Sequence, residues 1–360
     1  LMAVLKHVRF ATMEEGFLRD TVRAWPALLS AAGQRVLSKS VAPVVGDVQP
    51  LLRLGFGPQR IYLVGGFEDG SVSTVRAYDP LLDSWCEVSS MATKRYCHAA
   101  AALNGKLYVI GGSTDDEDRA LAKAEVYDPK ADSWQPLPSM PTGRRSLAAV
   151  AVAGKVYTIG GINKDEENSG AVEAYDPISG AWTQVASLPM ARSFHTATVV
   201  EGKIYVLGGD RVGRDDDDEN ETSDRVDVYD PAADSWQQIA TMPTARSLHS
   251  AAVLDGKIYV TGGWVLSAAD LIEHSDALEA YDPVADSWTT LASLTQSRAY
   301  HTSAVVKGKL CVFGGEFSDF KCTHLVEVYS PTSNSWARAA GLPSAIDLST
   351  GIDQSAAVAL

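Results

Sequence analysis

Short apolar runs alternate with polar, glycine-containing segments along most of the chain, and the same pattern returns six times. In the copy at residues 98–112, an alanine-rich run and the run Lys106–Ile110 flank the pair Asn104-Gly105, and two glycines follow. Two short apolar runs around Asn-Gly are the strongest local signal for a β-hairpin. A third run ending in Tyr-Asp-Pro and a fourth run beginning at a tryptophan complete the copy. Each copy therefore predicts a four-stranded antiparallel sheet.

Glycine pairs and tryptophans mark the repeat. The first glycines of successive pairs are 46, 49, 48, 54 and 52 residues apart, and a period of about 50 residues indicates stacked supersecondary units. The pairs are Gly65 and Gly66, Gly111 and Gly112, Gly160 and Gly161, Gly208 and Gly209, Gly262 and Gly263, and Gly314 and Gly315. The tryptophans are Trp85, Trp134, Trp182, Trp236, Trp288 and Trp336. We interpret all of these residues as structural.

Residue sizes predict how the sheets are arranged. The first run of each copy holds small residues and the last holds the tryptophan, so each sheet is a wedge, and wedges stack around an axis. Glycine has no Cβ, so a neighbour can approach closely at the glycine pairs. No hairpin pattern precedes Arg60, whereas residues 355–360 look like a missing first strand. Residues 60–360 therefore predict an all-β, six-bladed β-propeller that is closed by the C-terminal strand.

The glycine doublet with Tyr and Trp at this spacing resembles the kelch repeat, and all six copies carry the resemblance. The resemblance implies a kelch propeller that binds proteins through two sets of loops on one face. One set follows the glycine pairs, and the other precedes the first run of each copy. The corresponding residues, expected to bind substrate, are Phe67, Ser113, Ile162, Asp210, Trp264, Glu316, Cys97, Ser146, Phe194, Leu248 and Tyr300.

Residues 1–42 follow a helical pattern, with apolar residues at three- and four-residue steps. The pattern consists of His7-Val-Arg-Phe10, Met13, Phe17-Leu18, Val22 and Pro26-Ala-Leu28. It resembles the end of a BACK domain, the helical module between the BTB domain and the kelch repeats of BTB-BACK-kelch proteins. The alternative is an unrelated helical linker. Residues 43–59, punctuated by Pro50, Gly55, Gly57 and Pro58, are interpreted as a linker.

Charge and cysteine content narrow the class of partner and the compartment. The formal net charge of −14 argues against nucleic acid or an anionic membrane as the partner. No apolar run approaches the ~20 residues of a membrane-spanning helix. The four cysteines, Cys86, Cys97, Cys311 and Cys322, lack C-x-x-C spacing and favour reduced thiols in the cytoplasm or nucleus. The chain begins with neither a signal-peptide profile nor Met and is interpreted as a fragment.

The sequence contains residue types that occur in metal and catalytic sites, but their pattern favours neither kind of site. His98, His195, His249 and His301 occupy one repeat position, but zinc needs nitrogens at ~2.0–2.1 Å from one ion, and four separate blades cannot easily converge so far. Acidic residues lie in runs typical of solvated loops, and neither a Ser-His-Asp spacing nor a phosphate loop is present. We therefore expect no metal, no cofactor and no catalysis. A kelch-fold enzyme, and a thiol sensor at Cys97 beside Arg95, are the alternatives.

The large apolar members of the two loop sets are expected to face solvent, where they are typical interface anchors. They are Phe67, Phe194, Leu248, Trp264 and Tyr300. Acidic runs at residues 115–118, 165–167 and 215–219 surround them, so the favoured partner is a basic protein or peptide segment.

The two resemblances together imply a substrate-recognition module of a BTB-BACK-kelch adaptor for a cullin-RING ubiquitin ligase. The propeller would hold the protein substrate, and the cullin scaffold would be bound only through a BTB domain outside these residues. The alternative is an actin-binding or scaffolding kelch protein.

Charged residues also recur in register. An arginine stands three residues before the repeat histidine position, at Arg95, Arg144, Arg192, Arg246 and Arg298. An acid stands two residues before the repeat tyrosine, at Glu125, Glu173, Asp227, Glu279 and Glu327. In the first copy the corresponding residues are Ile346 and Arg76, so both partners change together. This co-occurrence predicts five partly buried Arg–carboxylate pairs, one in each of the other blades. The alternative is that the acids are solvated strand residues.

Overall fold

The computed structural model describes residues 60–66, 70–79, 84–115, 120–211, 222–267, 271–317, 321–339 and 356–359. The chain divides into two compact units, Leu1–Pro58 and Gln59–Leu360, and the described residues all belong to the second. The BACK-like helices predicted for residues 1–42 and the linker of residues 43–59 lie outside the described residues. Within the described residues there is no helix that is long and apolar enough to cross a membrane.

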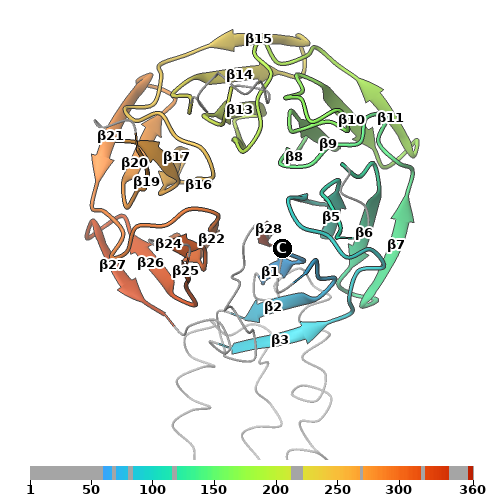
Figure 1. Ribbon diagram of the computed structural model, residues 1–360, viewed down its shortest axis with the longest axis horizontal. Helices are drawn as coiled ribbons and strands as arrows, with labels where there is room; N and C mark the ends of the chain where they lie inside the picture. Colours follow the sequence, from blue (N-terminus) through green and yellow to red (C-terminus); the bar gives the residue numbers. More distant parts are fainter. Residues whose placement is uncertain are drawn as a thin grey trace, which may run out of the picture. The chain divides into compact units, whose positions relative to one another are not determined.

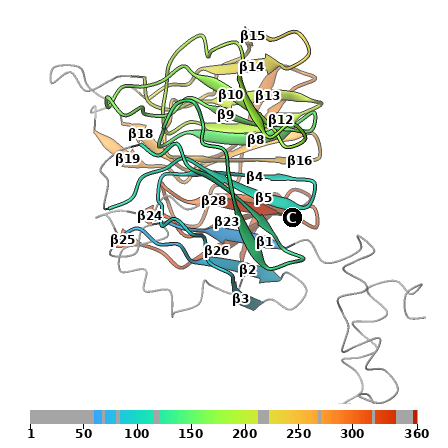
Figure 2. The ribbon, with the colours of Figure 1, turned by 90° about the vertical axis from the view of Figure 1, so that its right-hand side faces the viewer.

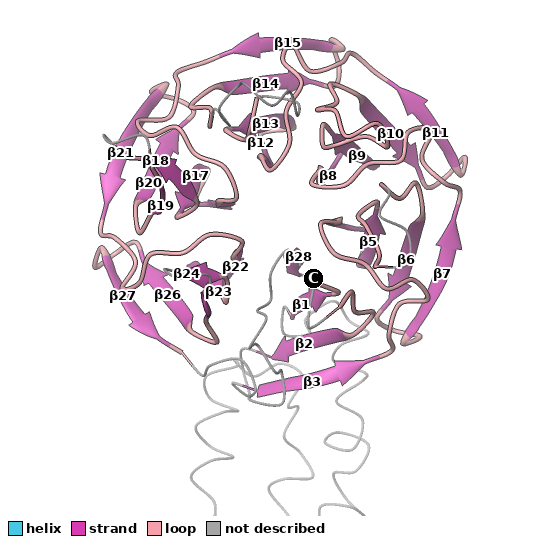
Figure 3. Cartoon of the chain, viewed as in Figure 1, coloured by secondary structure: helices cyan, strands magenta, loops and turns pink. Residues whose placement is uncertain are grey.

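Six four-stranded antiparallel sheets surround a central axis as the blades of a propeller (Figure 1), and the described elements are all strands (Figure 3). From the axis outwards, blade 1 contains β28 (Ala356–Ala359), β1 (Ile61–Val64), β2 (Val75–Asp79) and β3 (Ser84–Val88), and blade 2 contains β4 (Ala99–Leu103), β5 (Lys106–Ile110), β6 (Ala124–Asp128) and β7 (Ser133–Leu137). Blade 3 contains β8 (Ala148–Val152), β9 (Lys155–Ile159), β10 (Val172–Asp176) and β11 (Ala181–Gln184), and blade 4 contains β12 (Thr196–Val200), β13 (Lys203–Leu207), β14 (Val226–Asp230) and β15 (Ser235–Gln238). Blade 5 contains β16 (Ser250–Leu254), β17 (Lys257–Thr261), β20 (Leu278–Asp282) and β21 (Ser287–Leu291), and blade 6 contains β22 (Thr302–Val306), β23 (Lys309–Phe313), β26 (Val326–Ser330) and β27 (Ser335–Arg338). The predicted all-β, six-bladed fold is confirmed.

The two ends of the repeat region meet in blade 1. The C-terminal strand β28 pairs antiparallel with β1, and the register runs from Ile61 opposite Ala359 to Val64 opposite Ala356. Blade 1 therefore takes its innermost strand from the end of the chain and its other three from the beginning. The predicted closure by the C-terminal strand is confirmed.

Two short additional hairpins rise from one side of the ring, β18 (Trp264–Leu266) with β19 (Ile272–His274) and β24 (Glu316–Phe317) with β25 (Lys321–Cys322) (Figure 2). We call this side the loop face. It carries the loops between the second and third strands of each blade and the loops that lead into the first strands. Isolated backbone bridges join the two loop sets, such as the bridge between Tyr96 and Ser113.

Tyrosine and tryptophan connect neighbouring blades. Within blade 4 the rings of Tyr229 and Trp236 lie 5.0 Å apart between centroids. The Trp236 indole Nε1 donates to the carbonyl oxygen of Ala186 in blade 3 at 2.8 Å, and the Tyr229 ring contacts Tyr157 of blade 3 at 6.1 Å. Trp134, Trp182, Trp288 and Trp336 make the same type of indole-to-carbonyl bond to the preceding blade. The recurring Tyr-to-Trp spacing thus places both rings at a blade junction.

The glycine pairs are required because the next blade approaches them closely. A Cβ on Gly160 would lie 2.6 Å from Cε1 of His195 and 2.7 Å from the carbonyl oxygen of Arg192, and the φ of Gly160 is +58°. The second glycine meets backbone as well, because a Cβ on Gly161 would lie 2.6 Å from the carbonyl oxygen of Arg145. The repeat histidine and the first glycine of the preceding blade are therefore complementary in shape.

Replacing Gly160 with alanine is expected to lower the free energy of unfolding by about 3 kcal/mol or more, through overpacking added to backbone strain. The matched control is Gly202→Ala, since Gly202 has a similar φ of +76° but nothing within 4 Å of its Cβ position. Its cost should be about 1–2 kcal/mol, the left-handed penalty alone. Chemical denaturation of both variants measures the difference, and equal losses would rule out the packing explanation.

Each predicted arginine pairs with the acid of its own blade, and all five arginines are fully buried. The distance from the guanidinium to the carboxylate oxygen is 2.6 Å for Arg95 and Glu125, 2.7 Å for Arg144 and Glu173, and 2.8 Å for Arg246 and Glu279. The pairs Arg192–Asp227 and Arg298–Glu327 are also formed. In the first blade, Arg76 lies near the exposed Glu87 instead, at 3.7 Å. The predicted pairing is confirmed.

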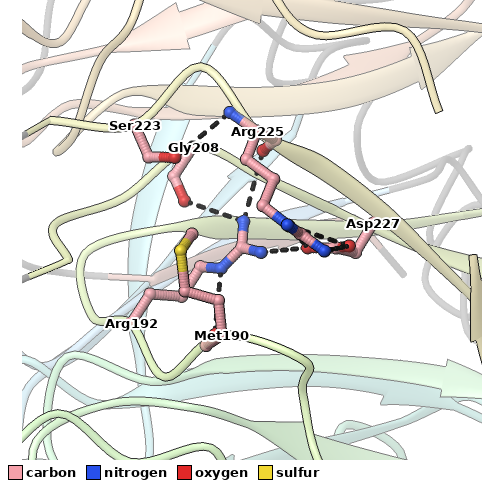
Figure 4. Close-up of polar contacts among 6 residues, drawn as sticks. All are labelled: Met190, Arg192, Gly208, Ser223, Arg225 and Asp227. Carbon is pink, nitrogen blue, oxygen red and sulfur yellow. Dashed lines mark hydrogen bonds and ion pairs between the residues drawn. The ribbon is translucent and has the colours of Figure 1, made fainter. Parts of the chain in front are cut away.

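The arginines also bind backbone, which fixes the base of the loop face. Arg144 donates to the carbonyl oxygens of Gly160 at 2.7 Å and Ala171 at 2.9 Å, while its own carbonyl accepts from the N–H of Gly112 in the preceding blade at 2.9 Å. One residue therefore joins the loop, its own blade and its neighbour. Figure 4 shows the blade 4 version, in which Arg192 and Arg225 both bind the carboxylate of Asp227.

Candidate protein-binding face

Five residues of the loops leading into the first strands surround the axial opening of the loop face. Cys97, Ser146, Phe194, Leu248 and Tyr300 all adopt left-handed conformations, with φ between 51° and 54°. From Ser146 onwards, each N–H donates to the carbonyl oxygen of the preceding member, for instance Phe194 to Ser146 at 3.1 Å and Leu248 to Phe194 at 3.0 Å. Together with the residues that follow them, they line a shallow cavity of about 120 Å³. We call this cavity the axial mouth.

The left-handed conformations point to a constraint at the axial mouth. Bulky side chains avoid positive φ, so such residues persist only where the surroundings hold them, and they cluster at functional sites. Here the inter-blade hydrogen bonds hold the backbone, and that backbone sets the position of the Phe194 and Tyr300 side chains.

The repeat histidines next to the axial mouth are packing groups. All four are buried, and the rings of His98, His195 and His301 lie against glycines of the preceding blade. Burial, with the positive charge of the repeat arginine nearby, lowers the pKa of His98, His195 and His301 to about 3. They are therefore neutral at physiological pH. Among the residues that the structure describes, no group of His, Cys, Asp or Glu is arranged to hold a metal ion.

An aromatic and polar cluster joins blades 5 and 6 beside the axial mouth. The Trp264 ring meets Tyr300 edge to face at 5.4 Å between centroids and His274 at 6.3 Å. Nε2 of His274 lies 3.1 Å from a carboxylate oxygen of Glu316 in β24. The backbone of Trp264 pairs with Ser247, which directly precedes Leu248. The β18–β19 hairpin is thus fixed to the axial mouth by the ring and backbone of Trp264, and to β24 by the contact between His274 and Glu316.

The structure divides the sequence-predicted site residues by exposure. Ile162, Asp210, Phe194, Trp264 and Tyr300 are partly exposed, whereas Cys97, Ser113, Ser146, Leu248 and Glu316 are buried. The expectation that Leu248 faces solvent is wrong, because its backbone belongs to the inter-blade hydrogen-bonded series at the axial mouth. Phe67 lies outside the described residues. So do residues 116–118 and 215–219 of the acidic runs, whereas Asp115 and residues 165–167 are described. Asp115 accepts hydrogen bonds from Ser71, and Glu166 pairs with Arg145.

Asp210 is the carboxylate with the most unusual environment on this face. It follows the glycine pair of blade 4, and its backbone pairs with Ser193, which precedes Phe194. Burial raises the pKa of Asp210 to about 6, and the nearby side chain of Ser247 in blade 5 only partly opposes this effect. Within the described part of the chain, Asp210 forms no ion pair at hydrogen-bonding distance. Its backbone bridge to Ser193 places Asp210 in the loop next to Phe194, and no described basic side chain pairs with its carboxylate.

We expect Asp210→Asn to be more stable than the wild type at pH 7.5. The folded-state pKa lies above the unfolded value, so ionisation disfavours the folded state, and the penalty develops as pH rises from about 4 to above 6. The variant should gain about 1–3 kcal/mol in free energy of unfolding at pH 7.5 and nothing below about pH 4. Denaturation curves across this range measure the gain. A constant difference at all pH values would contradict the assignment.

Three exposed aliphatic residues at the tip of the β18–β19 hairpin were not anticipated from the sequence. Leu266, Leu271 and Ile272 are 42%, 62% and 51% exposed. The sequence signal was that apolar residues occupy a loop that is mostly polar and acidic in the second, third and fourth copies. They add an apolar extension to the partly exposed aromatic residues near the axial mouth.

Comparisons with known proteins agree with this architecture. A domain family described as KLHDC2/KLHL20/DRC7 Kelch-repeats matches residues 54–209 and 97–315, and the Kelch motif matches residues 297–343. A human Kelch repeat and BTB domain-containing protein 12 is 30% identical over 131 residues, which cover 33% of this chain and 21% of that protein. Human Kelch-like protein 35 is 36% identical over 34% of this chain and 19% of its own length. An Arabidopsis thaliana F-box/kelch-repeat protein is 34% identical over 31% of this chain and 27% of its own length.

The solved structure of YjhT has the same fold. It matches with a TM-score of 0.66 over 79% of this chain and 98% of that chain, at 16% identity. Such low identity shows a shared fold alone.

Proposed function

Because the chain belongs to the kelch-repeat family, which supports a protein-interaction module, we propose that its loop face captures a basic segment of a partner protein. The observation that carries the proposal is the set of partly exposed aromatic residues, Phe194, Trp264 and Tyr300, on the same face as Asp210, whose carboxylate forms no ion pair with a described basic residue. Aromatic side chains in a fixed position are typical binding anchors, and a nearby carboxylate selects cationic partners.

A non-catalytic role fits the chemistry at the axial mouth. The buried histidines pack against glycines and stay neutral, and the acids opposite the repeat arginines are fully engaged in buried ion pairs. Groups committed to packing and to ion pairs are not free to transfer protons to a ligand. A kelch-fold enzyme remains the less favoured alternative.

The finer part of the proposal concerns the whole protein. We place this propeller in a BTB-BACK-kelch adaptor that presents the captured protein to a cullin-RING ubiquitin ligase in the cytoplasm or nucleus. The matching segments cover less than a third of the similar proteins, whose names include BTB and F-box domains as well as kelch repeats. The sequence upstream of Leu1 discriminates between these architectures. An actin-binding or scaffolding protein would bind its partner without changing the partner's lifetime or ubiquitination.

Two steps test the proposal. Partners are first captured with the propeller and with its Trp264→Ala variant. The affinity of a purified partner for each is then measured. The control is Ile178→Ser, which removes an exposed apolar residue from the turn at the opposite end of blade 3. We expect a partner that Trp264→Ala loses and the control retains. Because exposed charges are screened beyond ~8 Å at physiological salt, its affinity should fall several-fold between about 50 and 300 mM salt. A strongly acidic partner, or binding that strengthens with salt, would contradict the proposal.

A further inference from the structure

The β18–β19 hairpin presents apolar side chains to solvent in a pattern that the fold does not require. Among the described residues, five large hydrophobic side chains are exposed, and three of them, Leu266, Leu271 and Ile272, belong to this hairpin. The others, Ile178 and Val284, are single residues in turns of blades 3 and 5. Scattered apolar residues are normal on a protein surface, whereas a contiguous group marks an interaction site.

The strand register shows that this group continues the axial mouth. Trp264 pairs with His274, and Leu266 pairs with Ile272. Side chains two residues apart on a strand lie on the same face, as do directly paired residues. Leu266 and Ile272 therefore share the face of the hairpin that carries Trp264 and His274. Since Trp264 contacts Tyr300, one apolar stripe, formed by Tyr300, Trp264, Leu266 and Ile272, runs from the axial mouth to the hairpin tip.

The base of the stripe is held in place, so the stripe is organised before a partner binds. Trp264 exchanges backbone hydrogen bonds with Ser247 at 3.1 and 2.8 Å. His274, on the same face, reaches Glu316 of blade 6. A fixed surface loses little conformational freedom on binding, which favours affinity.

The acidic groups of this face indicate the charge of the partner. The hairpin carries the exposed carboxylate of Glu273, and the chain as a whole has a net charge of −14. At the inner end of the stripe, Trp264 pairs through its backbone with Ser247, and Asp210 lies near enough to Ser247 for that side chain to act on the carboxylate. No described basic residue forms an ion pair with Asp210. An acidic partner would meet repulsion here, whereas a cationic side chain would be attracted by the Asp210 carboxylate.

We propose that the β18–β19 hairpin is the specificity element of the loop face. It binds an extended partner segment whose apolar side chains lie along the stripe and whose lysine or arginine reaches Asp210. This inference rests on the proposed function but goes beyond it, since partner capture at the axial mouth does not require the hairpin tip.

The probe is a displayed library of random 12-residue peptides selected on the wild-type propeller. Selected peptides are synthesised, and their affinities are measured against four variants. Leu266→Ser with Ile272→Ser removes the outer stripe, and Tyr300→Ala removes its inner end. Asp210→Asn removes the carboxylate. Ile178→Ser with Val284→Ser is the matched control, because it removes two aliphatic residues that are 97% and 92% exposed.

We expect selected peptides to combine aliphatic or aromatic residues with a nearby lysine or arginine. Their affinity should fall at least tenfold with the outer-stripe variant and severalfold with Asp210→Asn, and change less than twofold with the control. Peptides that lose affinity with Tyr300→Ala but bind the outer-stripe variant normally would overturn this inference and leave the proposed function standing. Failure to select any peptide would overturn the proposal that the partner binds as an extended segment. If instead the wild type dimerises and the outer-stripe variant is monomeric by light scattering, the stripe is a self-association surface.

Discussion

Replacing Glu173 with glutamine is expected to lower the free energy of unfolding by about 3–5 kcal/mol, because it leaves a buried guanidinium without a negative partner. Arg144 is fully buried and lies 2.7 Å from the Glu173 carboxylate. Burial lowers the pKa of Arg144, and Glu173 opposes this shift, so the carboxylate offsets part of the cost of burying the guanidinium charge. Thermal and denaturant unfolding of the purified propeller measures the loss.

Two further variants test whether the expected loss of stability is specific to the buried pair or would follow from breaking any ion pair. Lys257→Met breaks an exposed pair with Asp282, at 3.0 Å, and should change the free energy of unfolding far less than Glu173→Gln does, because solvent screens exposed pairs. Combining Arg144→Met with Glu173→Leu removes both charges. This double variant should recover much of the lost stability, because it leaves no buried charge without a partner. A Glu173→Gln variant as stable as Lys257→Met would show that the pair of Arg144 and Glu173 does not stabilise the base of the loop face.

Ending the chain before Ser355 is expected to remove the innermost strand of blade 1 and open the ring. Strand β28 supplies the four residues that pair with Ile61–Val64. Without it, β1 becomes an unpaired edge, and exposed edges promote aggregation. We expect a large fall in melting temperature, with aggregation visible by light scattering. A chain shortened only by Leu360 retains all four paired residues and serves as the control. Equal melting of the short chain and the parent would contradict closure by β28.

The sequence was informative wherever the repeat imposed the same requirement on every blade. Glycine pairs, the Tyr-to-Trp spacing and the Arg–acid register all reflect contacts that recur between or within blades. The pair of Arg144 and Glu173 was predictable because blade 1, with Arg76, departs at both of its positions. Closure by residues 356–359 followed from counting strands.

Individual loop residues were less predictable, since their exposure depends on neighbours that are distant in sequence. Leu248 looks like a solvent-facing anchor, but its left-handed backbone hydrogen-bonds to Phe194 of the neighbouring blade, and the side chain is buried. The β18–β19 hairpin was missed because two three-residue strands give too short an alternation to detect.

Side-chain footprinting of the propeller with a purified partner tests the loop-face assignment most directly. Hydroxyl radicals label aromatic rings according to their exposure, so labelling is compared with and without the partner. We expect binding to protect Phe194, Trp264 and Tyr300, while the partly exposed Trp182 and Trp288 of the outer strands stay unchanged. Protection of the outer tryptophans, with the three loop-face aromatic residues labelled as before, would contradict it.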